Sequence, residues 1–200
     1  MNYQAAEHYI LHQLRTNLSP TLYYHGVHHT LDVVQAARRL AEAERIDDEE
    51  SVELLHTAAC FHDAGFLTTY QGHEEKGGLI AREVLPRYNY LPQQIEIICG
   101  MIMATRIPQT PLTQLERIIC DADLDYLGRD DFEPIADSLF QELQARNMVT
   151  SKPAWNRIQV QFLEKHHYWT TTAIAWRQAT KQQWLDKLRT IVESETNLAN

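Results

Sequence analysis

His62 and Asp63 stand next to each other in the stretch Ala59-Cys60-Phe61-His62-Asp63-Ala64-Gly65-Phe66. This stretch closes an apolar run in which Val52, Leu55 and Ala58 follow the three-to-four spacing of a buried helix face. Gly65 favours a break in the helix directly after the pair. The sequence therefore predicts a core helix that presents an imidazole and a carboxylate at its C-terminal end.

The rest of the chain is also typical of helices joined by short turns. It contains no convincing run of alternating β-branched residues and only seven glycines. Spacing, acidic helix starts and prolines predict further helices. Their approximate ranges are residues 3–16, 26–41, 47–61, 73–85, 92–102, 112–127, 132–146 and 152–195, the last one broken near His167-Tyr168. We expect an all-α fold, a compact helical bundle that forms a single domain over residues 1–200.

Composition excludes several classes of function. The chain has 200 residues and a net charge of −9, which argues against binding to a nucleic-acid backbone. No apolar run approaches the roughly 20 residues that cross a bilayer, and residues 1–14 lack the pattern of a signal peptide. The three cysteines are odd in number and show no CxxC spacing, so we expect buried thiols in a cytoplasmic protein and assign none of them to a metal.

Further histidines and acids lie before and after the His62-Asp63 pair. Upstream is Tyr24-His25-Gly26-Val27-His28-His29, and downstream is Cys120-Asp121-Ala122-Asp123-Leu124-Asp125. Three carboxylates so close together on a helix repel one another unless they are solvated or bound to a cation. Two imidazoles and two carboxylates can hold one divalent ion and leave positions open. Spacing alone does not distinguish Asp121 from Asp123, and it places Asp121 and Asp125 on one helix face.

These residues together resemble the HD superfamily of metal-dependent phosphohydrolases, over roughly residues 22–129. The matching residues are Tyr24-His25 with His29, the His62-Asp63 pair followed by Gly65, and Ala122-Asp123-Leu124. The resemblance implies an HD-type bundle with a metal-binding core at residues 22–130 and additional C-terminal helices at 131–200. It also implies that the metal ligands are His29, His62, Asp63 and Asp123, with Asp121 as the alternative to Asp123.

Other residues are candidates for contacts with substrate. His73 lies in a His-x-x-x-Gly segment that resembles the segment by which two-metal relatives hold a second ion. Those relatives supply a further histidine before the last aspartate, but residues 98–117 contain no histidine. We therefore expect one metal ion, with His73 directed at substrate or a metal-bound water. Arg106 and Lys76 are candidate phosphate contacts, because cations of this kind bind phosphate oxygens.

The resemblance implies hydrolysis of a phosphomonoester, phosphodiester or phosphoanhydride bond in a small molecule, with a nucleotide favoured, by attack of metal-bound hydroxide. His25 would act as the general acid, and Asp63 would be the second catalytic residue as well as a metal ligand. Manganese or magnesium is favoured, and iron, zinc, cobalt or nickel would also suit mixed nitrogen and oxygen ligands. Two alternatives differ in class: a non-catalytic HD domain that senses a ligand and acts through a protein partner, and a di-iron oxygenase, which needs more histidines. The sequence identifies neither the substrate nor the oligomeric state.

Overall fold

The computed structural model describes residues 1–198, and within this range every regular element is a helix. The predicted all-α fold is confirmed. The chain forms two compact units, one of residues Met1–Asp123 and one that begins at Leu124. The predicted division into residues 22–130 and 131–200 within a single domain stays a prediction.

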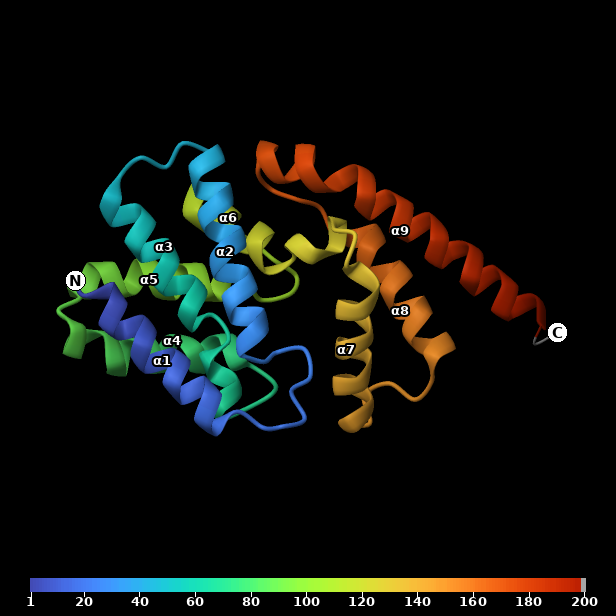
Figure 1. The fold of residues 1–200 in the computed structure, drawn as a ribbon, viewed down its shortest axis with the longest axis horizontal. Coiled ribbons are helices and arrows are strands. Elements are labelled where there is room, and N and C mark those ends of the chain that lie inside the picture. Colours follow the sequence, from blue (N-terminus) through green and yellow to red (C-terminus); the bar gives the residue numbers. More distant parts are fainter. Residues whose placement is uncertain (199–200) are drawn as a thin grey trace. The chain divides into compact units, whose positions relative to one another are not determined.

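The first unit is a bundle built around one central helix. Its elements are α1 (Tyr3–Asn17), α2 (Val27–Ala43), α3 (Glu49–Phe61), the 3-10 turn η1 (Ala64–Leu67), α4 (His73–Val84), the 3-10 turn η2 (Leu85–Tyr88), α5 (Pro92–Ala104) and α6 (Gln114–Asp123). α3 contacts α1, α2, α5 and α6, and its neighbours surround it in the ribbon views (Figure 1). The C-terminal end of α3 lies in the interior of this unit, where Phe61 and His62 are at most 1% exposed.

The local sequence explains why α3 begins and ends where it does. Asp48 caps its N-terminus by accepting a hydrogen bond from the Ser51 amide at 2.8 Å, which typically contributes about 1 kcal/mol. Glu49 and Glu50 in the first turn add favourable charge against the helix dipole. At the other end every residue from Thr57 to Phe66 is buried. The N-terminus of α3 therefore lies at the surface and its apolar C-terminal half is buried, which places His62 and Asp63 in the interior.

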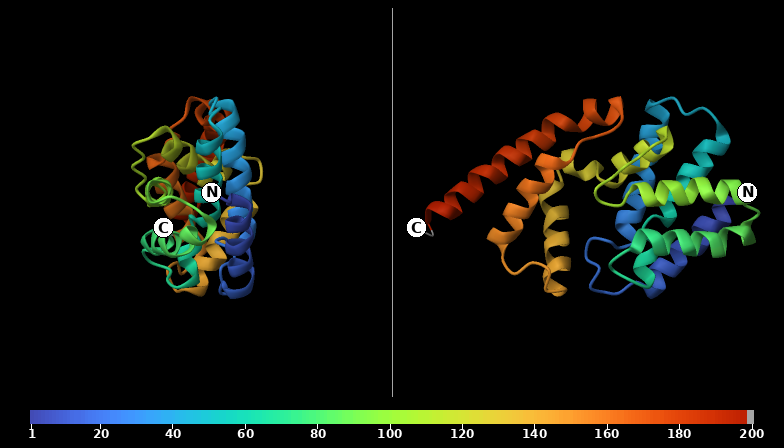
Figure 2. Two further views of the ribbon diagram at one scale, coloured as in Figure 1. Left: turned by 90° about the vertical axis from the view of Figure 1, so that its left-hand side faces the viewer. Right: turned by 180° about the vertical axis from the view of Figure 1, so that it is seen from behind.

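The second unit contains η3 (Asp125–Gly128), α7 (Phe132–Ala145), α8 (Lys152–Lys165) and the long helix α9 (Thr171–Leu198). α8 and α9 pack side by side, and α9 also packs on η3 (Figure 2). Gly128 allows this contact, because a Cβ there would lie only 2.4 Å from the backbone oxygen of Arg177. The break predicted near His167 falls between α8 and α9.

One predicted helix is wrong in length. The helix predicted over residues 112–127 ends at Asp123, and the chain continues as η3. Asp121 and Asp125 therefore do not share a helix face. Asp125 is instead buried against Arg177, whose Nε and Nη2 donate to its carboxylate at 2.6 and 3.1 Å. An arginine 52 residues away thus relieves part of the acidic repulsion that the sequence suggested.

The three cysteines are buried free thiols, as predicted. Of the helices described, none combines the length and the apolar character that a membrane crossing requires.

Candidate metal centre

Three helices of the first unit bring four side chains to one point. His29 lies in the first turn of α2, His62 at the C-terminal end of α3, and Asp123 is the last residue of α6. Asp63 lies between α3 and η1, where the backbone changes from φ −55°, ψ −39° at His62 to φ −99°, ψ 7°. Adjacent residues on a regular α-helix point about 100° apart. The change of backbone conformation lets His62 and Asp63 face the same point.

The distances between ligand atoms are short and similar. Asp123 Oδ1 lies 3.1 Å from His29 Nε2 and 3.5 Å from His62 Nε2. Asp63 Oδ2 lies 3.6 Å from His29 Nε2 and 3.3 Å from His62 Nε2. The two imidazole nitrogens are themselves 3.4 Å apart. His29, His62 and Asp123 form the tightest group, with ligand atoms within 4.8 Å of one another.

These separations fit a shared cation. Four ligand atoms that surround one ion tetrahedrally at about 2.0–2.2 Å lie roughly 3.3–3.6 Å from one another. The contacts between the imidazoles and the carboxylates span 3.1–3.6 Å. Two carboxylates carry the charge that balances a divalent ion. The donor types, two nitrogens and two oxygens, therefore fit the expected metal. His29, His62 and Asp123 are already grouped as its ligands would be, whereas Asp63 would have to move toward Asp123 to complete the set. The role of these four residues as the ligand set stays a prediction.

Hydrogen bonds prepare the side chains for this role. Nδ1 of His62 donates to the backbone oxygen of Ala59 at 2.7 Å, so its Nε2 faces the cluster. Metal-bound histidines usually show this second hydrogen bond. Asp63 Oδ2 is buried and has close contacts with both imidazoles but no aligned hydrogen bond. A buried carboxylate oxygen without a hydrogen bond is costly, and a cation at this point would remove the cost.

Charge interactions within the cluster are strong. Burial by itself opposes the charged forms, but the charges of Asp63 and Asp123 outweigh it and raise the pKa of His62 well above its usual range. In return, and again against the effect of burial, the neighbouring histidines hold the pKa of Asp63 and of Asp123 well below the ordinary carboxyl range. Both carboxylates therefore stay ionised, and a proton on His62 occupies the place that a metal cation would compete for.

An aromatic wall lies beside the carboxylates. Phe66 stacks on His73 at 4.0 Å between ring centroids and also contacts His25 at 4.3 Å. Nε2 of His73 lies 3.5 Å from Asp63 Oδ1, whereas Oδ2 is the oxygen of Asp63 that contacts His29. His25 precedes α2 in a bend, and its ring centroid lies 5.9 Å from that of His29. Both candidate histidines thus border the cluster without belonging to its tightest group.

Gly65 explains how His73 comes so close. A Cβ at Gly65 would lie 1.9 Å from the backbone oxygen of His73, so only glycine permits the start of α4 to contact η1. This contact holds His73 within reach of Asp63. The glycine after the His62-Asp63 pair therefore does more than end a helix.

The remaining predicted residues lie farther out or face elsewhere. Asp121 is fully buried in α6, but residues two apart on a helix point to different sides, and the tight group contains Asp123. Arg106 is exposed and forms an ion pair with Glu75 at 3.0 Å. Lys76 is exposed on α4, one turn after His73. Neither cation is placed in the cluster.

Two residues near the site were not identified from the sequence. Phe66 contacts the rings of both His25 and His73, and Glu74 is a buried acid whose carboxylate lies 3.7 Å from His73. The position of Phe66 directly after Gly65 was a usable signal, because a residue in that turn must lie near His62. Glu74 gave no signal, since an acid in the first turn of a helix is ordinarily solvated.

Comparison with known proteins agrees with this geometry. The model of the HD domain family matches residues 26–125, half of the chain. The chain belongs to the HD domain family. The match begins just before His29 and ends just after Asp123, so it spans all four clustered residues of the HD domain. An HD domain suggests metal-dependent phosphohydrolase chemistry, and the histidine and aspartate cluster could bind a metal ion.

More distant comparisons add little about function. An uncharacterized protein of Clostridium beijerinckii is 32% identical over 85 residues, which cover 41% of this chain and 53% of that protein. The chain thus spans about half of the length of this curated relative. No solved structure matches the chain.

Proposed function

We propose that this HD domain protein is a metal-dependent phosphohydrolase that acts in the cytoplasm on a small phosphorylated molecule, with nucleotides as the first candidates. The scissile bond would be a phosphomonoester, a phosphodiester or a phosphoanhydride. One observation carries the proposal. Two imidazole nitrogens, from His29 and His62, and two carboxylate oxygens, from Asp63 and Asp123, face one buried point, and each nitrogen lies 3.1–3.6 Å from each oxygen.

These four residues would hold one divalent ion, with manganese or magnesium favoured. Such an ion supplies Lewis acidity, which lowers the pKa of a bound water and offsets charge on phosphoryl oxygens. The protein would keep this chemistry enclosed, because His29, His62 and Asp63 are all at most 5% exposed. Burial would also strengthen each charge interaction with a transferring phosphoryl group.

His25 is the proposed general acid. Its ring centroid lies 5.9 Å from that of His29, which is near enough to reach a substrate at the cluster. It is outside the tightest ligand group. Its neighbours Phe66 and Tyr24 hold the ring in place, with centroids at 4.3 and 4.6 Å. A histidine so placed can protonate a leaving oxygen near neutral pH.

His73 is the first candidate for a phosphate contact. Its Nδ1 donates to the backbone oxygen of Tyr70 at 3.3 Å, and its Nε2 faces Asp63. Arg106 would need to exchange Glu75 for a phosphate, but a surface ion pair of this kind contributes little stability. Lys76 would bind phosphate only as a point charge at the rim.

The test is a screen for released phosphate. The purified protein would be stripped with a chelator, reloaded with one divalent metal at a time, and assayed on nucleoside mono-, di- and triphosphates, cyclic nucleotides and sugar phosphates. Turnover that requires metal and disappears in Asp63→Asn supports the proposal. His28→Ala is the matched control, because His28 is the exposed histidine next to His29 and should remain active.

A different outcome would favour the other class of function. If the metal-loaded protein binds a nucleotide but releases no product from any substrate of the panel, the phosphohydrolase proposal fails. The same protein would then be a ligand-sensing HD domain that acts through a protein partner. Oxygen uptake by the iron-loaded protein would indicate an oxygenase instead.

A further inference from the structure

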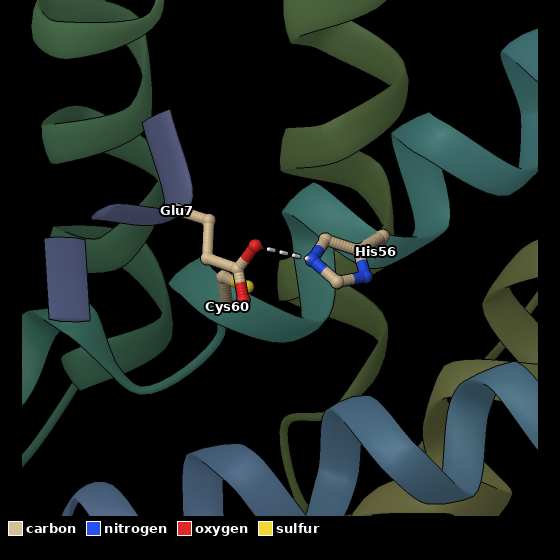
Figure 3. Close-up of side chains that lie close together, drawn as sticks. All are labelled: Glu7, His56 and Cys60. Carbon is tan, nitrogen blue, oxygen red and sulfur yellow. Dashed lines mark ion pairs between the residues drawn. The ribbon is translucent and has the colours of Figure 1, made fainter. Parts of the chain in front are cut away.

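A second group of metal-ligating side chains lies in the first unit, away from the HD cluster. Glu7 comes from α1, and His56 and Cys60 come from α3, one helical turn apart. Their ligand atoms lie within 4.8 Å of one another. Figure 3 shows the Glu7 carboxylate reaching the His56 ring, with the Cys60 sulfur beside it. Cys60 and His62 are two residues apart, so they point to different sides of α3.

The His56 side chain forms an ion-pair contact with Glu7 but makes no aligned hydrogen bond through Nε2. Its Nε2 lies 3.1 Å from Glu7 Oε2, yet this contact is not aligned as a hydrogen bond, and Nε2 is a buried atom without a hydrogen-bond partner. Tyr3 contacts the edge of the ring at 5.3 Å between centroids. A fixed imidazole whose buried nitrogen contacts a carboxylate without an aligned hydrogen bond is an arrangement that a cation between the two groups would satisfy.

The ligand types indicate which cation would bind. Zinc accepts nitrogen, sulfur and oxygen at about 2.0–2.3 Å, which places ligand atoms roughly 3.3–3.6 Å apart around a tetrahedral ion. The Glu7–His56 contact is already that short, and the full group needs shifts of about 1 Å. We propose that Glu7, His56 and Cys60 form a zinc-binding site, separate from the HD centre, with a fourth position open to water.

A surface cavity reaches one member of the group. His56 and Tyr3 line a surface cavity of about 340 Å³ between α1, α2 and α3. Val34 and Ala37 of α2 form part of its apolar wall, and Glu53 lies on the same wall as His56. The His56 side chain is 23% exposed and the Glu7 side chain 29%, whereas Cys60 is fully buried. Neither Glu7 nor Cys60 lines the cavity, so an ion that entered there would have to pass the His56 ring to reach the thiol.

The consequence of such a site is a link between α1 and the core helix. Glu7 lies outside the residues that the HD domain model matches, 26–125, while His56 and Cys60 lie inside them. An ion bound by all three residues would attach the N-terminal helix to the helix that carries His62 and Asp63. The site would thus have a structural role, and its occupancy would depend on zinc and not on the substrate of the HD centre.

Cobalt provides the test, because it replaces zinc and a thiolate bound to cobalt gives an intense charge-transfer absorption in the near ultraviolet. The HD cluster contains no sulfur ligand, so its own cobalt would not give this band. We expect the chelated full-length protein to show the band with cobalt and to lose it when zinc is added. The band should persist in Asp63→Asn, which disables the HD cluster.

Variants assign the sulfur and guard against misfolding. Cys60→Ser should abolish the band, and Glu7→Gln, a change at a half-buried side chain, should weaken cobalt binding by at least the about 10–100-fold that loss of an outer partner costs. Cys99→Ser is the matched control at another buried thiol and should keep the band. The proposal is overturned if the wild-type protein shows no band, if Cys60→Ser retains it, or if Glu7→Gln, folded by circular dichroism, binds cobalt as tightly as wild type.

Discussion

Removal of the metal from the HD centre should lower the stability of the protein by a calculable amount. The proposed ligands come from α2, α6 and the C-terminal end of α3, so a bound ion would join three helices that pack against one another. An ion that binds only the folded state stabilises it by about 2.7 kcal/mol when its free concentration is a hundredfold above Kd. For a chain of this length each kcal/mol moves Tm by about 2–4 °C, so chelation should lower Tm by about 5–11 °C.

The assay should use manganese and far-ultraviolet circular dichroism. Manganese prefers oxygen and nitrogen ligands, so it would leave the thiol-containing group at Glu7 largely unoccupied. Tryptophan fluorescence is the wrong probe, because Trp155, Trp169, Trp176 and Trp184 all follow Leu124 and report on the second unit. Asp63→Asn serves as the control, since its Tm should not respond to manganese. An unchanged wild-type Tm after confirmed loss of the ion would refute the idea that this centre stabilises the fold.

Three further predictions concern single groups. His25→Ala should keep its metal, as measured by elemental analysis, and lose about 10²–10⁴-fold in kcat, so loss of the ion would show that His25 is a ligand. The metal-free protein should be less stable at alkaline pH, because the pKa of His62 is raised in the folded state. The stability that this raised pKa contributes is complete below the ordinary histidine pKa of about 6.5 and is lost as the pH rises through the raised pKa. A flat profile of Tm against pH would contradict this. Arg106→Ala should lower kcat/KM on the best phosphate substrate while the metal content stays unchanged, and Arg106→Lys should restore kcat/KM in part. If kcat/KM of both variants stays within about twofold of wild type, Arg106 is a surface cation paired with Glu75.

Much of the fold was predictable because local signals coincided with burial. Asp48 and the acids after it start α3, Pro92 starts α5, and the apolar face of α3 continues as far as Phe61. The error at α6 has a physical cause. The sequence after Asp123 still contains apolar residues at helical spacing, but Asp125 turns away to pair with Arg177, and no local signal reveals a partner from α9.

The site was predictable as a set of residue types and not as a geometry. The resemblance to the HD superfamily, more than spacing, identified His29, His62, Asp63 and Asp123, which the structure brings together. The contact of Gly65 with His73 was not predictable, since it depends on how α4 packs against η1. The Glu7 group escaped notice for a similar reason: His56 and Cys60 have a plain helical spacing, and only the packing of α1 adds the third ligand.

A crystal structure with a divalent ion, located by anomalous scattering, tests the central claim most directly. The account predicts one ion among His29 Nε2, His62 Nε2, Asp63 Oδ2 and Asp123 Oδ1, about 2.0–2.2 Å from each ligand atom. Asp121 should remain outside its coordination sphere. An anomalous peak that lacks Asp63 or Asp123 as a ligand, or the absence of any peak at this point with millimolar metal present, would contradict the assignment of this cluster as the metal centre.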